Sequence, residues 1–229
     1  TEFRNQIAAH THHLPQSSGS RCINCHMPFT SFGLLKAVRS HRIDSPHSEM
    51  TAKHGRPNAC NLCHLDRPLS WTDATLAEWY GQPRTPSADP QIPQPSSVLH
   101  QLLSGDAVQR AVAAWHLGWE PARTISGQSW QAPFLAELLN DPYAAVRYIA
   151  FNSLQRLAGY ADFDYDFVAP EAARKKAADR ARALWNALER TSAPEHRLHL
   201  LLTPDGDIDR ERFQELLRKR DNKPLLFPE

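Results

Sequence analysis

The sequence lacks a long apolar run, a large net charge and an abundance of sulfur-containing residues. No stretch of its 229 residues approaches the roughly 18 consecutive apolar residues that a membrane-spanning helix requires. The net charge of +1 gives no indication of nucleic-acid binding. Hydrophobic residues make up 41% of the chain, which is enough for a globular core. We therefore expect one or two globular domains that neither span a membrane nor bind nucleic acid.

Cysteine is rare, and all four cysteines fall in two copies of one motif. The copies are Cys22-Ile-Asn-Cys25-His26 and Cys60-Asn-Leu-Cys63-His64. The pattern C-x-x-C-H is typical of covalent c-type haem attachment, in which two thioethers tether the porphyrin and the adjacent histidine binds iron. Two copies with no cysteine left over predict two covalently bound haem c groups. His26 and His64 are then the proximal iron ligands.

Other uses of paired cysteines fit the spacing less well. Two C-x-x-C pairs can bind zinc, but zinc ribbons separate the pairs by about 15–20 residues, and the gap from Cys25 to Cys60 is much longer. Thiol–disulfide exchange favours one C-x-x-C at a helix N-terminus within a βαβ pattern, and no such pattern surrounds either pair. Structural disulfides are a third use, although cysteines this close in sequence make poor cross-links.

The second axial ligand of each iron must come from elsewhere in the chain, and it is usually histidine or methionine. Methionine is scarce: Met27 directly follows a proximal ligand and cannot cross to the other face of that ring, which leaves Met50. Eight of the twelve histidines lie in the first 64 residues, so bis-histidine ligation is favoured, with a lower potential than a Met/His pair would give. The candidate distal ligands are His41 and one of His10, His12 and His13, followed by His47 and His54.

Residues 1–81 are expected to form a loop-rich dihaem segment. Proline and serine are frequent there and helical periodicity is weak, so the polypeptide buries little by itself and is expected to be unfolded without its cofactors. One helix is predicted to run to Tyr80, capped by Ser70 or Thr72 and ended by Gly81. Its aromatic residues pack on the second haem or form ordinary core contacts. Basic side chains that could pair with haem propionates, or remain solvated, are Arg39, Arg42, Lys53, Arg56 and Arg67.

Residues 82–95 contain five prolines and are predicted to form a stiff linker. Helices are then predicted over Ser96–Leu103, Asp106–Leu117, Gln131–Asn140 and Pro142–Leu157, as two pairs within residues 96–160. Asp141 is expected to cap the last of these, with Pro142 in its first turn. The remaining residues, 161–229, are predicted to hold C-terminal helices near Pro170–Arg190 and Ile208–Arg220, with a less regular one at Ala193–Leu202. An acidic stretch, Asp205–Asp209, is predicted to cap the helix from Ile208.

An internal echo connects the two predicted helical pairs. Arg110, Val112, Ala113 and Leu117 match Arg147, Ile149, Ala150 and Leu154 at a constant offset of 37 residues (147 minus 110). This offset is close to the roughly 40-residue period of HEAT-type repeats, although a solenoid generally needs about three units. The alternative is an ordinary helical domain with a chance echo. The predicted fold is mainly α, with a loop-rich dihaem segment followed by a HEAT-like helical region.

Several segments together resemble a family of secreted multihaem c-type cytochromes. They are His10-Thr11-His12-His13, Gly19 to Pro28 with the first motif, Arg39-Ser40-His41, and Pro57 to His64 with the second motif. Some members of that family carry helical repeats after the haem segment, and many have further haem motifs upstream of the H-x-H-H segment. The resemblance covers roughly residues 5–160. It implies electron transfer, and it implies that the chain is the C-terminal part of a longer cytochrome or a natural short form.

These observations predict a dihaem electron carrier that acts between redox partner proteins, with the helical repeats as a docking surface. A haem enzyme of the nitrite- or peroxide-reducing type is the alternative, and it requires one five-coordinate iron with polar groups on its distal side. A third interpretation is an electron-transfer subunit of a larger complex. Residues 1–20 are polar and histidine-rich and do not resemble a signal peptide. Because C-x-x-C-H motifs receive haem on the outer side of the energy-transducing membrane, we expect a periplasmic or extracellular protein.

Overall fold

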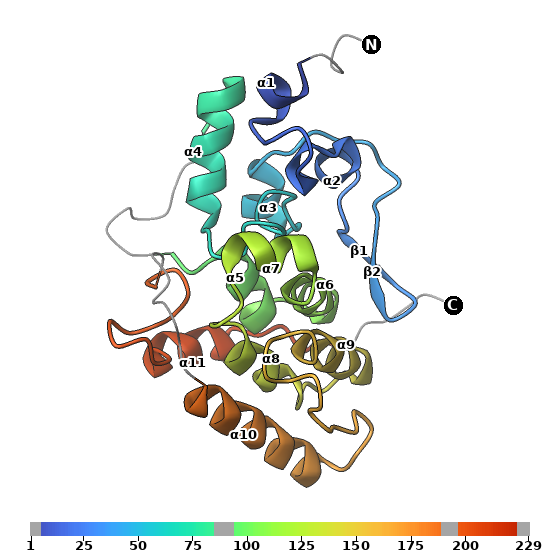
Figure 1. Ribbon diagram of the computed structural model, residues 1–229, viewed down its shortest axis with the longest axis vertical. Helices are drawn as coiled ribbons and strands as arrows, with labels where there is room; N and C mark the ends of the chain where they lie inside the picture. The colour runs from blue at the N-terminus through green and yellow to red at the C-terminus, as the bar shows by residue number, and fades with distance from the viewer. Residues whose placement is uncertain (1–5, 85–93, 189–196, 224–229) are drawn as a thin grey trace.

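The computed structural model describes residues 6–84, 94–188 and 197–223. The described residues form eleven α-helices, one short 3-10 helix and one two-stranded antiparallel hairpin (Figure 1), so the predicted mainly α class is confirmed. The first elements are α1 (Ile7–Thr11), η2 (Ser18–Ser20), α2 (Cys22–His26), β1 (Ser31–Gly33), β2 (Lys36–Val38), α3 (Glu49–His54) and α4 (Leu69–Tyr80). The later helices are α5 (Ser97–Ser104), α6 (Ala107–Leu117), α7 (Glu120–Ser126), α8 (Ala132–Leu138), α9 (Ala144–Leu154), α10 (Glu171–Ala187) and α11 (Arg210–Arg218).

The end of the molecule built from α1 to α4 and the hairpin contains few buried apolar side chains. In the described residues up to 84 these are Ala37, Leu62, Leu65 and Leu76. The regular elements at this end are short, and only α4 exceeds six residues. Burial of apolar surface is the main driving force of folding. The polypeptide at this end therefore contributes little to the free energy of folding by itself.

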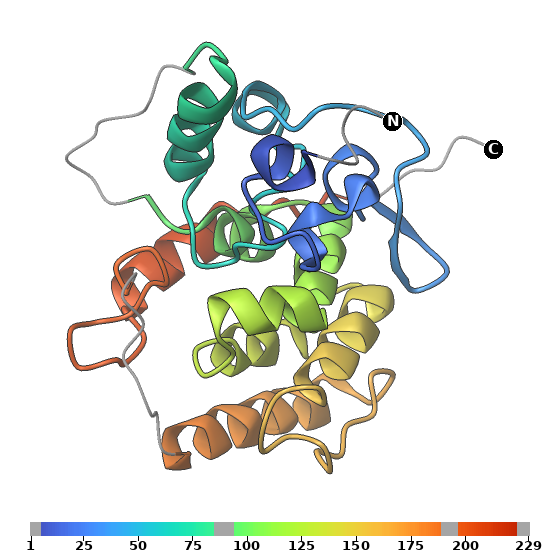
Figure 2. The same cartoon turned by 45° about the horizontal axis from the view of Figure 1, so that its top comes forward.

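The helices from α5 onward enclose the main hydrophobic core. Helix α6 packs between α5 and α9, α8 packs on α9 and α10, and α11 packs on α5 (Figures 1 and 2). Trp130, Phe134 and Leu102 are among the largest side chains that this core buries completely. The hairpin lies against α6, where Ala37 is buried. The helical core therefore supports the hairpin within the described residues 6–84.

Several helix boundaries follow from local sequence. The side chain of Ser96 caps α5 by accepting a hydrogen bond from the Leu99 amide. Asp106 and Gln109 form a reciprocal capping box at the start of α6. Asp209 caps α11. The predicted helices at Ser96–Leu103, Asp106–Leu117, Gln131–Asn140 and Ile208–Arg220 are thus confirmed to within a few residues.

Other expectations about the elements are wrong. Neither Ser70 nor Thr72 caps α4, which starts at Leu69 after Pro68. Helix α9 starts at Ala144, so Pro142 is not in its first turn. Residues 197–202, the described part of the expected helix at 193–202, form turns and a bridge between Leu202 and Ile208. Helix α7 and the hairpin were not predicted. Most of the expected linker 82–95 lies outside the described residues.

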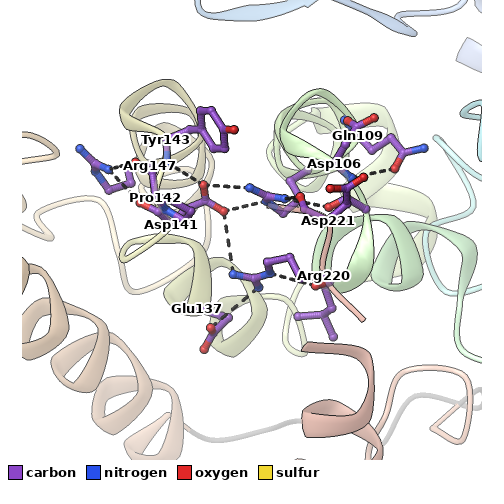
Figure 3. A network of polar contacts seen from close by, with 12 residues as sticks. Asp106, Gln109, Glu137, Asp141, Pro142, Tyr143, Arg147, Arg220 and Asp221 are labelled. Carbon is purple, nitrogen blue, oxygen red and sulfur yellow. Dashed lines mark hydrogen bonds and ion pairs between the residues drawn. The ribbon is translucent and has the colours of Figure 1, made fainter. Parts of the chain in front are cut away.

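A buried ion pair joins the two central helix pairs (Figure 3). The Arg110 Nε atom lies 2.7 Å from Asp141 Oδ2, and both side chains are 0% exposed. Arg110 also donates to the carbonyl oxygens of Gly105 and Asp221. Arg220 lies 3.9 Å from Asp141 and donates to the Leu103 carbonyl. Because a buried charge is tolerated only when it is paired and hydrogen-bonded, Asp141 serves mainly as the counter-ion of Arg110 rather than as the expected cap.

His116 lies inside the same core, on α6. It is 1% exposed, and its ring lies 4.9 Å from that of Trp115 and 5.7 Å from that of Trp119. Burial lowers the pKa of His116 to about 4, although a hydrogen bond to the Val112 carbonyl opposes the shift. His116 is therefore a core residue.

None of the helices in the described part of the chain combines the length and apolar character needed to cross a membrane.

We predict that Asp141→Ala lowers the free energy of unfolding by about 3–5 kcal/mol, because it leaves the buried Arg110 guanidinium without its carboxylate. Chemical denaturation of the full chain measures this. The matched control is Asp179→Ala, which removes a carboxylate that is 76% exposed and paired with Arg182. The control is expected to cost less than about 1 kcal/mol. Equal losses in the two variants would contradict the assignment.

His116 predicts a pH dependence of stability. Its pKa in the folded chain, about 4, lies below the usual 6.5, so the folded chain holds it neutral. As the pH falls below 6.5, His116 is protonated in the unfolded chain but stays neutral in the folded chain. The free energy of unfolding therefore decreases until about pH 4, where the folded chain is protonated as well. We expect His116→Gln to reduce the loss of unfolding free energy between pH 7 and pH 4 by about 3 kcal/mol. Parallel stability curves for wild type and variant would refute this.

Candidate haem-attachment site

The first C-x-x-C-H motif is a turn of helix and the second is a hydrogen-bonded turn. The first motif is α2 itself, so Cys22, Cys25 and His26 stand at positions i, i+3 and i+4 on one face. In the second motif the His64 amide donates to the Cys60 carbonyl at 2.8 Å, which closes the same turn. Each motif therefore presents its two thiols and its histidine together, as a porphyrin held at two points and ligated below would require.

Two pairs of histidine rings face each other at nearly the same separation. The ring centres of His10 and His26 are 6.2 Å apart, with the ring planes at 9°. Those of His13 and His64 are 6.1 Å apart, at 39°. Two imidazoles that bind opposite sides of one metal at about 2 Å have ring centres about 6.3 Å apart, since each centre lies about 1.1 Å beyond its ligating nitrogen. The two observed separations fit a bridging iron.

Backbone carbonyls orient two of these rings. His26 Nδ1 lies 2.9 Å from the Asp44 carbonyl oxygen, and His13 Nδ1 lies 2.5 Å from that of Thr11. A carbonyl oxygen only accepts, so Nδ1 is the donor in both rings, and Nε2 is the nitrogen left to face a metal. Metal-binding histidines usually donate their second nitrogen in this way, which fixes the ring and its tautomer.

The histidines predicted as distal ligands lie in different surroundings. The rings of His10 and His13 are paired with those of His26 and His64. His12 lies between them in sequence, but its ring stacks on that of Trp79, with centres 4.2 Å apart. His41 is exposed and takes part in neither ring pair. Among the next candidates, His47 lies 3.9 Å from Asp44 and His54 is exposed.

Cys25, Cys60 and Cys63 are in surroundings that disfavour thiolate. Burial raises the pKa of Cys60 to about 12 and that of Cys63 to about 11, and the nearby Cys25 adds to both shifts. Burial also raises the pKa of Cys25. Thiol-exchange cysteines have a lowered pKa instead, so that alternative is not supported. All four cysteines are free, and no three His, Cys, Asp or Glu side chains in the described ranges form a metal-binding group.

Burial has the opposite effect on the proximal histidine of the second motif. It lowers the pKa of His64 to about 4, and the neighbouring His13 acts in the same direction. The ring is therefore neutral, which is the form that binds a metal.

Arg39 closes the turn of the first motif. Its guanidinium donates to the carbonyl oxygens of Ile23 and Met27, at 2.6 and 3.0 Å, and to Asn24 Oδ1 at 2.7 Å. It also lies 4.0 Å from the centre of the Phe29 ring. Arg39 thus adds a second donor to the Ile23 carbonyl, which already accepts from the Met27 amide, and binds the Met27 carbonyl at the C-cap of α2. Its charge therefore lies on the turn of the first motif, whereas the sequence left it as a propionate partner or a solvated charge.

The other basic candidates already have carboxylate neighbours. Arg42 and Arg56 lie 3.5 and 3.6 Å from Asp44. Lys53 pairs with Glu49 within α3. Arg67 lies 3.5 Å from Asp66 and 5.5 Å from the centre of the Trp71 ring.

Ser126, at the end of α7, ties the second motif to the helical core. Its hydroxyl donates to the Cys63 carbonyl at 3.0 Å and accepts from the Leu65 amide at 2.8 Å. Sequence reasoning missed this residue because it did not predict α7. The available signal was Pro121 near the start of a helix and Gly127 just after its end.

Comparisons of the chain with protein-family models, with curated proteins and with solved structures found no match.

We predict that Ser126→Ala lowers the unfolding free energy of the full chain by about 1–3 kcal/mol, because the buried Leu65 amide then loses its acceptor. The control is Thr124→Ala, which removes an exposed hydroxyl bonded to the Glu120 carbonyl in the same helix. We expect the control to change stability by less than about 0.5 kcal/mol. A cost for Ser126→Ala no greater than that of the control would show that the bridge does not stabilise the second motif.

Proposed function

We propose that the protein is a dihaem c-type cytochrome that transfers electrons between redox partner proteins. Cys22 and Cys25 hold one haem and Cys60 and Cys63 hold the other. The proximal ligands are His26 and His64. The observation that carries the proposal is the pair of ring separations, 6.2 Å for His10–His26 and 6.1 Å for His13–His64, each of which fits one iron.

Haem held at these sites would supply a one-electron couple at iron. His10 and His26 would fill both axial positions of one iron, and His13 and His64 those of the other. With both irons six-coordinate, no position remains for a substrate, which favours a carrier over a nitrite- or peroxide-reducing enzyme.

The closeness of the two sites supports transfer between them. His10 and His13 belong to one short segment, three residues apart, yet they face different motifs. Cys25 of the first motif lies near enough to raise the pKa of Cys60 and Cys63 in the second. An electron that arrives at one site therefore has a short route to the other.

The helical region is proposed to be a pair of HEAT-like units that form a docking surface. Helices α6 and α9 have equal lengths and start 37 residues apart, at Ala107 and Ala144. Arg110 donates to the Gly105 carbonyl and Arg147 to the Pro142 carbonyl, both five residues earlier. The same arginine contact in both copies supports a repeat over a chance echo. Repeat modules commonly present binding surfaces of this kind.

The proposed location is periplasmic or extracellular, because C-x-x-C-H motifs are loaded with haem there. A carrier that works within a larger multihaem assembly fits the same sites.

The test is expression in a cell competent in cytochrome maturation, followed by mass measurement and optical spectroscopy. We expect the polypeptide mass plus two haem groups, and purely low-spin spectra. His10→Ala and His13→Ala are each expected to convert one of the two irons to a high-spin form. His41→Ala is the matched control and is expected to leave both irons low-spin.

The mass of the bare polypeptide would refute the proposal. The ligand assignment would be refuted if the His10 and His13 variants kept low-spin spectra while the His41 variant gained a high-spin iron. A high-spin iron in the wild-type protein that binds cyanide readily would favour the enzyme.

A further inference from the structure

The last two residues of α4 contact all three histidines of residues 10–13, called the distal segment below. The Tyr80 hydroxyl donates to the His10 carbonyl at 2.6 Å. The Trp79 ring stacks on His12, with centres 4.2 Å apart and planes at 8°. The same Trp79 ring meets His13 edge to face, with centres 6.3 Å apart. Figures 1 and 2 show α1 beside the end of α4.

Within the described residues, other side-chain hydrogen bonds of this segment are short-range and polar. Helix α1 has five residues, and none of them is buried. The hydroxyls of Thr11 and Ser20 lie 2.9 Å apart, and Ser20 also donates to the His13 carbonyl at 3.2 Å. A short segment with exposed residues and few apolar contacts opens at low cost. Its position therefore depends strongly on Trp79 and Tyr80.

The opposite end of α4 is fixed to the second haem motif. The buried Thr72 hydroxyl donates to Asn61 Oδ1, inside that motif, at 2.8 Å. The Trp71 ring lies 4.9 Å from that of His64. Gly81 ends the helix in the left-handed conformation, and its amide donates to the Ala77 carbonyl. Helix α4 thus connects the second motif, at its first turn, to the distal segment, at its last turn.

We infer that Trp79 and Tyr80 are positioning residues that hold the distal imidazoles against both irons. Because His10 and His13 lie on one segment held by one helix end, both irons keep or lose their second ligand together. This inference rests on the proposed function, and it assigns the coordination state of both haems to a single protein contact.

The experiment uses the oxidised holoprotein, with cyanide as the probe of an open iron position and with the high-spin fraction as a second readout. Tyr80→Phe is expected to raise the cyanide-accessible fraction about fivefold, the factor that one neutral hydrogen bond typically contributes. Trp79→Ala is expected to bind two equivalents of cyanide, and Trp79→Phe, which keeps a ring against His12, to restore the closed state. The matched control is Tyr143→Phe, since the Tyr143 hydroxyl donates to the Lys223 carbonyl in an equally exposed contact.

The inference is overturned if Tyr80→Phe and Trp79→Ala bind cyanide like wild type, if Tyr143→Phe has the same effect, or if one iron opens while the other stays closed. Tyr80→Phe keeps the test decisive should Trp79→Ala fail to fold. A wild-type protein without covalent haem is recognised beforehand by its mass, and that result refutes the proposed function rather than the role of α4 alone.

Discussion

The separation within two pairs of histidine rings is the constraint on which the proposed cofactor sites depend. At 6.2 and 6.1 Å, the ring separations match the spacing of two imidazoles that bind one metal, and they also lie within the range of ordinary aromatic pairs. The hydrogen bond from His26 to the Asp44 carbonyl keeps one proximal ring in the required orientation. The same end of the chain has little apolar core. Two large flat apolar groups, held at these pairs, would supply the burial that the polypeptide lacks.

The helical region has the opposite energetics. Its core is closed by large apolar side chains and by the fully buried Arg110–Asp141 pair, so it does not need a cofactor to cohere. Two side chains connect the helical region to the end with little apolar core. Ser126 donates to the Cys63 carbonyl, and the Gln109 side-chain amide donates to the Gly55 carbonyl. A preformed platform of this kind reduces the disorder that haem binding would have to overcome. It also keeps the two motifs in a fixed relation to α4.

The sequence predicted the features that depend on local chemistry. The two motifs, the mainly α class and the helices predicted to start at Ser96 and Asp106 each follow from a few adjacent residues. Features that depend on tertiary contacts were not predictable. The Asp141 side chain could be a cap or a counter-ion, and only the approach of Arg110 decides. The hairpin turn places Leu34 and Leu35 at positive φ without the usual Asn-Gly signal.

The proposed distal ligands illustrate the same limit. His10, His12, His13 and His41 look alike in sequence, because a distal ligand needs no fixed spacing from its motif. The placement of α1 against α4 distinguishes them. The His12 ring stacks on Trp79, whereas the His10 and His13 rings are paired with the histidines of the two motifs. Near-infrared magnetic circular dichroism of the oxidised holoprotein identifies the axial ligands of each iron most directly. Two bis-imidazole signatures are predicted, and a methionine–iron band or a high-spin iron would contradict the account.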